Sequence, residues 1–344
     1  MALAAIQWLG PSRPVVRGIV VSPEPPKSLI PGLVHVAGDH PVPGSNSAAA
    51  AGHLADMASK VGAGDQVYVL LSGGTTSLIG APVEGVTFTD YREAFQRLLG
   101  SGLDIDAMNA VRKQISRWSD GRLALALRHA MVQPVIMSDV VTDDPATIGS
   151  GPCSPSGDHS DFAHVAVPLL ARHDLPVRAA VSIARGRGLR VEHGPPLTGE
   201  ARDCGRELAH HLVRLANSVR ETTVVIAGGE TTVTLDGGEG SGGRCQELAL
   251  SAAEVLSHSP TRRICLLAAG TDGRDGPTDA AGAIVDGLTW RRILEAGRLP
   301  ASDLASHDSY KSLDVAGSLL RTGPTGTNML DLVIAVVRPA AVRA

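Results

Sequence analysis

Short runs of apolar and β-branched residues recur along the chain, separated by longer stretches in which apolar residues have helical spacing. The short runs predict buried strands, because each is bounded by polar or glycine-rich segments. The stretches 47–61, 90–99 and 199–219 predict helices between them. Such alternation is typical of an α/β fold with a largely parallel sheet covered on both faces. The predicted strands are 18–21, 67–71, 134–137, 222–226, 263–267 and 332–337.

The length of the chain favours two domains. Its 344 residues, 43% of them hydrophobic, exceed the size at which a single core usually stops growing. The segment 154–196 has few strand signals, so we expect the boundary between the domains within 200–222.

Charge and composition favour a small-molecule ligand. The net charge is −4, with 31 basic and 35 acidic residues spread along the chain, so no basic stripe is present to bind a nucleic acid. Four separated cysteines without a CxxC pair indicate neither a zinc site nor a disulfide framework. The chain contains neither an apolar run of bilayer length nor a basic amino-terminal signal region. We expect a cytoplasmic protein away from membranes, and the sequence leaves a homo-oligomer open.

Four predicted strands are followed by turns rich in glycine, small hydroxyl residues and acidic residues. In open parallel sheets, ligands bind outside the carboxyl ends of the strands, so we expect these turns to converge on one site. The turns are SGGTTS at 72–77, SDVVTDD at 138–144, GGETT at 228–232 and GTDGRDG at 270–276.

The glycines of two of these turns suit anion binding. Without a Cβ, glycine lets backbone N–H groups approach a phosphate or carboxylate closely. Gly73, Gly74, Gly228 and Gly229 are therefore candidate phosphate or substrate ligands, together with Ser72. The alternative is that they only form tight turns.

The acidic residues of the turns are candidate metal ligands. Phosphoryl transfer uses a hard divalent cation held by oxygen atoms. Each carboxylate could equally cap a helix or support a turn. The candidates are Asp139, Glu230, Asp272 and Asp275, with Asp272 preferred.

Two arginines are candidate anion ligands. Arg244 follows the glycine-rich segment 237–243 at the start of a predicted helix, where it could stabilise a transferring phosphoryl group or form a surface ion pair. Arg112 shares a helix face with Ser116. It could hold a substrate carboxylate or belong to a solvated face.

Several enzyme classes lack their motifs in this sequence. We find no GxxxxGK[ST] loop, no HRD or DFG set, and no GxSxG elbow. Gly238, Gly240 and Gly243 have GxGxxG spacing, but no acidic ribose partner follows, which disfavours a nicotinamide dinucleotide site.

As a set, several segments resemble the glycerate 2-kinase family along nearly the whole chain. LLSGGTTSLIGAP, NAVRKQISRWSDGRLA and SDVVTDDPATIGSGPCSP resemble its amino-terminal domain. AGGETTVTL, GSGGRCQELAL and AAGTDGRDGPTDAAGAIVDG resemble its carboxy-terminal MOFRL domain.

The resemblance implies an α/β protein of two domains facing a cleft: a Rossmann-like, parallel-sheet domain at 1–205 and a smaller α/β MOFRL domain at 222–338. It implies ATP and Mg²⁺ as cofactors and phosphorylation of D-glycerate to 2-phosphoglycerate. Arg244 matches the arginine implicated in phosphoryl transfer, while Ser72, Gly73, Gly74 and Arg112 fall in the substrate region. A catalytically impaired relative and an NAD(P)H-dependent hydroxypyruvate reductase remain alternatives.

Two departures from the family pattern bear on activity. Family members usually have SGGGSAL where this chain has Thr75 after Gly74, so substrate preference could differ. Family members also begin with a strand and a lysine-bearing turn upstream of the helix that we predict to end at Gly10. We therefore expect a chain that lacks its natural start and is weakly active.

Overall fold

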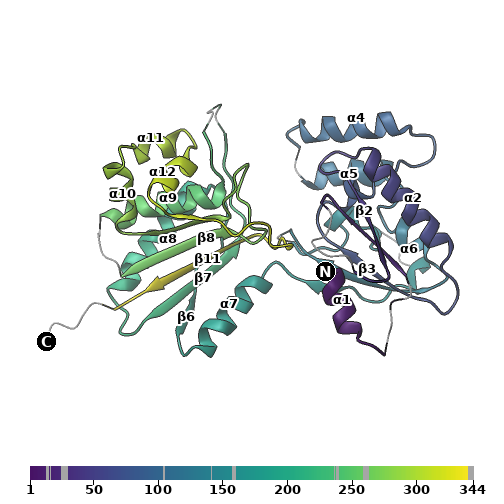
Figure 1. Cartoon of the computed structure of the whole chain (residues 1–344), viewed down its shortest axis with the longest axis horizontal. Coiled ribbons are helices and arrows are strands. Elements are labelled where there is room, and N and C mark those ends of the chain that lie inside the picture. The colour runs from purple at the N-terminus through teal and green to yellow at the C-terminus, as the bar shows by residue number, and fades with distance from the viewer. Residues whose placement is uncertain are drawn as a thin grey trace. The chain divides into compact units, whose positions relative to one another are not determined.

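The computed structural model divides into two compact units, Met1–Ala171 and Arg172–Ala344, each with its own sheets and core (Figure 1). Gly238 of the GxGxxG spacing lies outside the described residues. The structure describes residues 1–12, 15, 17–24, 30–103, 105–140, 142–156, 160–235, 237, 240–258 and 263–339.

Parallel pairing joins the strands of the first unit. β4 lies between β3 and β5 in a three-stranded sheet, and β1 pairs with β2 in a second, two-stranded sheet. The prediction of a parallel-sheet first domain is therefore confirmed. The strands are β1 (Gly18–Ser22), β2 (Leu33–Ala37), β3 (Gln66–Leu71), β4 (Met131–Met137) and β5 (Leu169–Ala171).

Local sequence explains how the helices of this unit begin and end. In α4 (Phe88–Leu99), the Thr87 side chain accepts a hydrogen bond from the Asp90 N–H, and Tyr91, Phe95 and Leu98 are buried on one face. The predicted helix end at Gly10 is confirmed. The other helices are α1 (Ala2–Leu9), α2 (Ser45–Ser59), α3 (Thr75–Leu78), α5 (Ile105–Ile115), α6 (Arg122–Ala126), and the 3₁₀ turns η1 (Ile148–Ser150) and η2 (Ser160–Phe162).

The second unit has a six-stranded mixed sheet in the order β10-β9-β8-β11-β7-β6. Only β6 and β7 pair in parallel, and the other four pairs are antiparallel. The expectation of a largely parallel sheet is thus wrong for this unit, because a short connection without a helix joins β8 to β9 and a parallel crossover needs more chain. The strands are β6 (Arg190–His193), β7 (Thr223–Gly229), β8 (Ile264–Gly270), β9 (Gly282–Asp286), β10 (Leu319–Leu320) and β11 (Asp331–Val337).

Both faces of this sheet are covered, as expected. Val224 and Ile226 of β7 pack against one helix, α7, whereas Val225 and Ala227 belong to the larger core formed with α8 and α9 (Figure 1). The alternation follows from the two-residue period of a strand. The helices are α7 (Leu175–Gly186), α8 (Ala201–Ala216), α9 (Arg244–Ser257), α10 (Thr289–Glu295), α11 (Pro300–Ala305) and α12 (Ser309–Val315).

Residues 172–205, which the sequence groups with the first domain, pack in the second unit. β6 pairs with β7, α7 covers β7, and α8 packs along α9. These contacts join segments that are distant in sequence, so strand signals along the chain do not mark where the first unit ends.

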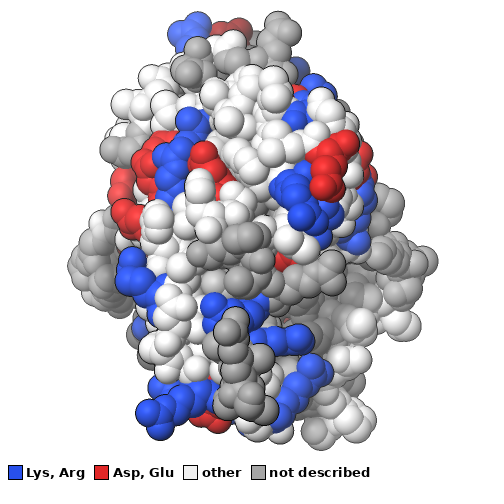
Figure 2. All heavy atoms as spheres, turned by 90° about the vertical axis from the view of Figure 1, so that its left-hand side faces the viewer, with Lys and Arg blue, Asp and Glu red and all other residues white. Residues whose placement is uncertain are grey.

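On the face shown in Figure 2, acidic and basic side chains lie together in the upper part, whereas basic side chains predominate in the lower part. Among the described residues, no helix combines the length and apolar character needed to cross a bilayer.

Candidate active site

In the second unit, Arg244 lies where a helix begins and three strands meet. β7 and β8 flank β11, and both end beside its first residue, Asp331, which pairs with Gly229 on one side and Gly270 on the other. Arg244 opens α9 and donates from Nε and Nη2 to the two Asp331 oxygens, at 2.6 and 3.1 Å. Its Nη1 lies 2.7 Å from Oε1 of Glu230. One guanidinium therefore binds two carboxylates.

The two carboxylates hold Arg244 in its charged form. Burial lowers the pKa of Arg244, but the hydrogen bonds to Asp331 and the charges of Asp331 and Glu230 offset this, so the pKa lies above its ordinary value. The Asp331 side chain is only 3% exposed, whereas that of Arg244 is 35% exposed. The guanidinium is thus fixed by a buried carboxylate, while part of the Arg244 side chain remains exposed.

Asp275, a predicted metal ligand, caps the helix that Arg244 opens. Its oxygens accept hydrogen bonds from the backbone N–H groups of Cys245 (3.1 Å) and Gln246 (2.8 Å), and it is 3% exposed. Burial raises the pKa of Asp275 to about 6. These contacts favour the capping alternative that the sequence left open.

The other predicted ligands of this unit lie at the same end of the sheet. Gly228 and Gly229 are still within β7, paired with Leu332 and Asp331, so they form the end of a strand and not a free turn. Glu230 follows β7 and Asp272 follows β8, beside the start of β11.

In the first unit, the loop Ser72-Gly73-Gly74 connects β3 to α3 and is packed against the side chains of Asp139 and His40. A Cβ on Gly73 would overlap the carboxylate of Asp139, which follows β4. A Cβ on Gly74, whose φ is +77°, would lie 2.7 Å from Cδ2 and 2.8 Å from Nε2 of His40. A side chain at either position would therefore displace Asp139 or His40, and the positive φ of Gly74 favours glycine there in addition.

Arg112 is a cation without an acidic partner among the described residues. Its guanidinium carbon lies 5.0 Å from the centroid of the Phe95 ring, and its Nε is buried without a hydrogen-bond partner. Burial lowers its pKa, while Tyr91 opposes the shift. A buried, unpaired guanidinium nitrogen is costly, so this arrangement favours a site that an anionic ligand completes.

A buried hydrogen-bond network links the helix of Arg112 to the glycine loop. Thr76 Oγ1 donates to Ser150 Oγ (2.9 Å), which donates to Asn109 Oδ1 (3.2 Å). Asn109 lies three residues before Arg112, on the same face of α5. The network therefore fixes α5 relative to the loop.

The structure brings the predicted residues together in two sets. Ser72, Gly73, Gly74 and Asp139 gather in the first unit, where the charges of Arg112 and Asp139 both shift the pKa of His40. The remaining candidates lie around Arg244 in the second unit. Among the described residues, no three His, Cys, Asp or Glu side chains form a group that could hold a metal by themselves.

Two residues at these sites escaped the sequence analysis. Asp331 directly precedes the predicted strand 332–337. An acidic residue at the start of an apolar strand is the sequence signal that could have marked Asp331 as a site residue. His40 follows β2, which was not among the predicted strands.

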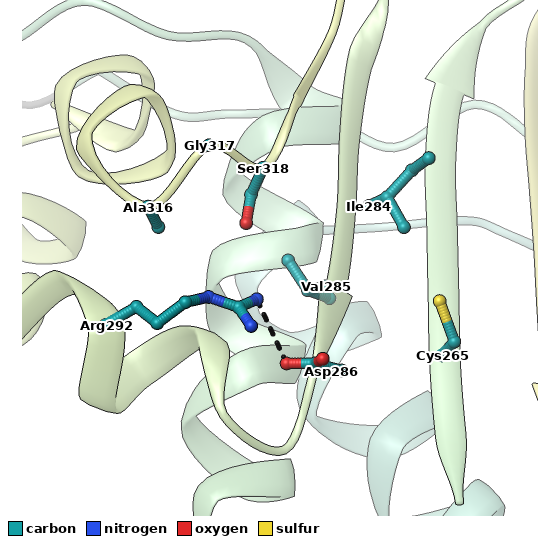
Figure 3. Close-up of a pocket in the computed structure, with 8 residues that line it drawn as sticks. All are labelled: Cys265, Ile284, Val285, Asp286, Arg292, Ala316, Gly317 and Ser318. Carbon is teal, nitrogen blue, oxygen red and sulfur yellow. Dashed lines mark hydrogen bonds and ion pairs between the residues drawn. The ribbon is translucent and has the colours of Figure 1, made fainter. Parts of the chain in front are cut away.

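A pocket of about 420 Å³ in the second unit lies at the opposite end of the sheet (Figure 3). Cys265 and Asp286 pair across β8 and β9 there, five residues, or about 17 Å, along β8 from Gly270. Arg292 reaches from α10 to Asp286, at 3.1 Å (Figure 3). This pocket is separate from the Arg244 cluster.

Known proteins resemble this chain over nearly its whole length. A D-glycerate 2-kinase from Thermotoga maritima is 35% identical, aligned over 98% of this chain and 88% of the relative. An Agrobacterium vitis protein with a provisional hydroxypyruvate reductase name is 34% identical, over 86% of each chain. The crystal structure of glycerate kinase from Thermotoga maritima matches with a TM-score of 0.88 at 34% identity, covering 98% of this chain and 88% of that one.

Two family models account for most of the sequence. The model described as a domain of unknown function (DUF4147) matches residues 1–185, and the model of the MOFRL family matches residues 223–331. With these matches and a relative 35% identical along almost the entire chain, the protein belongs to the family of DUF4147 and MOFRL proteins.

Proposed function

We propose that the protein is a glycerate 2-kinase, which transfers the γ-phosphoryl group of ATP to the 2-hydroxyl group of D-glycerate. The main support is the 35% identity to a D-glycerate 2-kinase across 98% of the chain. The products are 2-phosphoglycerate and ADP.

Arg244 is the proposed catalytic residue of the nucleotide side. A guanidinium has five N–H donors, and three of them are used in the contacts with Asp331 and Glu230. The two remaining donors, on a side chain that is partly exposed, suit the oxygens of a phosphoryl group in transfer, where an arginine stabilises the spreading negative charge. Asp331 keeps the guanidinium in a fixed orientation while this happens.

Glu230 and Asp272 are the proposed Mg²⁺ ligands. Both carboxylates follow strands that end beside Asp331, and Mg²⁺ is usually held by one or two carboxylates together with substrate phosphates. Two protein carboxylates fit this pattern even though no group of three is present. The metal would neutralise charge on the phosphates of ATP.

The glycine loop and Arg112 are the proposed binding groups for glycerate. Arg112 supplies a cation whose buried Nε lacks a partner, which suits the substrate carboxylate. Thr75, which departs from the usual family glycine, donates from Oγ1 to the Ser72 carbonyl oxygen at 2.6 Å and stiffens the loop.

The four cysteines support action in a reducing compartment, which we propose is the cytoplasm. All four are free thiols, three of them buried.

A coupled assay of ADP release with D-glycerate, ATP and Mg²⁺ tests the function, and ³¹P NMR of the product distinguishes phosphorylation at the 2-hydroxyl from that at the 3-hydroxyl. NADH oxidation with hydroxypyruvate is measured beside it. ADP release without NADH oxidation supports the kinase, and the reverse supports a reductase. Binding of glycerate and ATP without either reaction would identify a catalytically impaired relative. Full activity in excess chelator would contradict the metal sites.

A further inference from the structure

His40 of the first unit lies against the glycine loop, and the charges of Arg112 and Asp139 act on its imidazole ring. The imidazole lies on Gly74 of the glycine loop, and Nε2 is 2.8 Å from where a Cβ of that residue would be. Asp139 lies on the neighbouring Gly73. The side chain of His40 is exposed, so one edge of the ring faces the loop while the residue stays accessible to a small molecule.

Two charged groups act on this imidazole from different elements. Arg112 belongs to α5, and Asp139 follows β4. Burial against the loop lowers the pKa of His40, the positive charge of Arg112 lowers it further, and the carboxylate of Asp139 opposes them. The net shift favours the neutral ring near neutral pH, the form that has a nitrogen lone pair.

We propose that His40 is a catalytic residue of the first unit, which accepts the proton of the substrate hydroxyl group during phosphoryl transfer, while the charge of Asp139 stabilises the imidazolium that forms. This inference rests on the proposed kinase function. The hydroxyl oxygen forms a bond to the γ-phosphorus of ATP, the bond from that phosphorus to the bridging oxygen of ADP breaks, and the hydroxyl proton passes to the imidazole. The imidazolium then releases the proton to water.

Neighbouring groups are less suited to this role. Arg112 has no acceptor, and a carboxylate such as Asp139 is a weaker base than imidazole near neutral pH. The negative charge of Asp139 instead favours the protonated ring, so it would stabilise the imidazolium that His40 becomes when it takes up the proton.

The test compares His40→Gln and His40→Ala with His53→Gln, an exposed histidine on α2 of the same unit. We expect both His40 variants to lose about 10²-fold or more in kcat, with KM for glycerate and ATP changed less than about threefold, because base catalysis contributes to the transition state. Added imidazole should restore part of the activity of His40→Ala. His53→Gln should behave as the wild type.

The pH profile separates a base from a structural residue. Wild-type kcat should fall on the acid side with an apparent pKa below the ordinary histidine value of about 6.5, and this limb should be absent in His40→Gln. Unchanged kcat in both His40 variants of an active kinase would overturn the proposal and leave the kinase function standing.

A titration of the His40 ring protons by NMR, assigned with His40→Gln, is independent of turnover. A lowered pKa and a response to D-glycerate support the placement of His40 at the glycerate site whether or not ADP is released, and the catalytic role requires in addition the loss of kcat in the His40 variants. A pKa at or above the ordinary value without any response to D-glycerate overturns it.

Discussion

Arg244 and Asp331 form a two-point ion pair, in which Nε and Nη2 of the arginine donate to the two carboxylate oxygens across 87 residues of sequence. The pair joins the first residue of α9 to the first residue of β11. Because Asp331 is buried and Arg244 is half-buried, the arginine compensates an interior charge while part of its side chain stays exposed.

Replacing Arg244 by Ala should therefore affect both activity and stability. We expect kcat to fall about 10³-fold or more, since an arginine on a transferring phosphoryl group has effects of this size. The free energy of unfolding should fall by about 1–3 kcal/mol because Asp331 loses its main partner. Urea unfolding and the ADP-release assay measure the two effects. The double variant Arg244→Ala/Asp331→Ala should regain stability without activity, and normal turnover in either variant would exclude Arg244 from the mechanism.

The stability of the second unit should depend on pH through Asp275. Burial raises its folded-state pKa to about 6, above the usual aspartate range, so the folded state binds the proton more tightly than the unfolded state. This contribution is fully present below about pH 4 and is lost as the pH rises through 6. The free energy of unfolding of the wild type, minus that of Asp275→Asn, should fall by up to about 3 kcal/mol from pH 4 to pH 7. A difference that is constant with pH would contradict the assigned pKa.

The sequence predicted those features that depend on neighbours along the chain. The glycine loop after β3, the helix that Arg244 opens and the strands β1, β3 and β4 follow from local patterns, whereas β2 and β5 were not predicted. Gly73 and Gly74 were predicted to let backbone N–H groups approach an anionic ligand, which stays a prediction; the structure places the side chains of Asp139 and His40 against them.

Features that depend on non-local pairing could not be predicted in the same way. Asp331 gains its position only because β11 inserts between β7 and β8, which reverses the expected strand direction. Asp275 became a metal candidate because it follows a strand, although its hydrogen bonds reach a helix about 30 residues earlier. A single sequence does not show which of several distant partners satisfies a carboxylate.

Arg112 should contribute to substrate affinity more than to stability. Replacement by Met keeps the apolar stem against Phe95 but removes the charge. We expect KM for glycerate to rise about 10- to 100-fold, the value of a hydrogen bond to a charged group, with KM for ATP unchanged. Arg117→Met is the matched control, because Arg117 likewise lies over an aromatic ring, that of Trp118 at 4.7 Å, and is exposed. Equal effects of the two variants would mean that Arg112 only packs.

Gly73→Ala should reduce turnover because the added methyl group displaces the neighbouring side chain of Asp139. The added methyl group would overlap the Asp139 carboxylate, so Asp139 must shift away from the loop. A displacement of this kind can cost about 10²-fold in kcat. Stability should change little, because Gly73 is not among the residues with positive φ and the added Cβ meets the end of a side chain. Gly52→Ala, in open space within α2, is the control and should be neutral or stabilising by about 0.5–1 kcal/mol.

A double-variant comparison shows whether Gly73 acts through Asp139. If the methyl group acts only by displacing the carboxylate, Gly73→Ala should cause no further loss of kcat once Asp139 has been replaced by Ala. The double variant Gly73→Ala/Asp139→Ala should then match Asp139→Ala alone. Gly74→Ala should lose stability as well, because Gly74 has a φ of +77° and its Cβ would press on His40. Additive losses from Gly73→Ala and Asp139→Ala would instead show that the loop backbone itself contacts the substrate, and that Asp139 is not the group through which Gly73 matters.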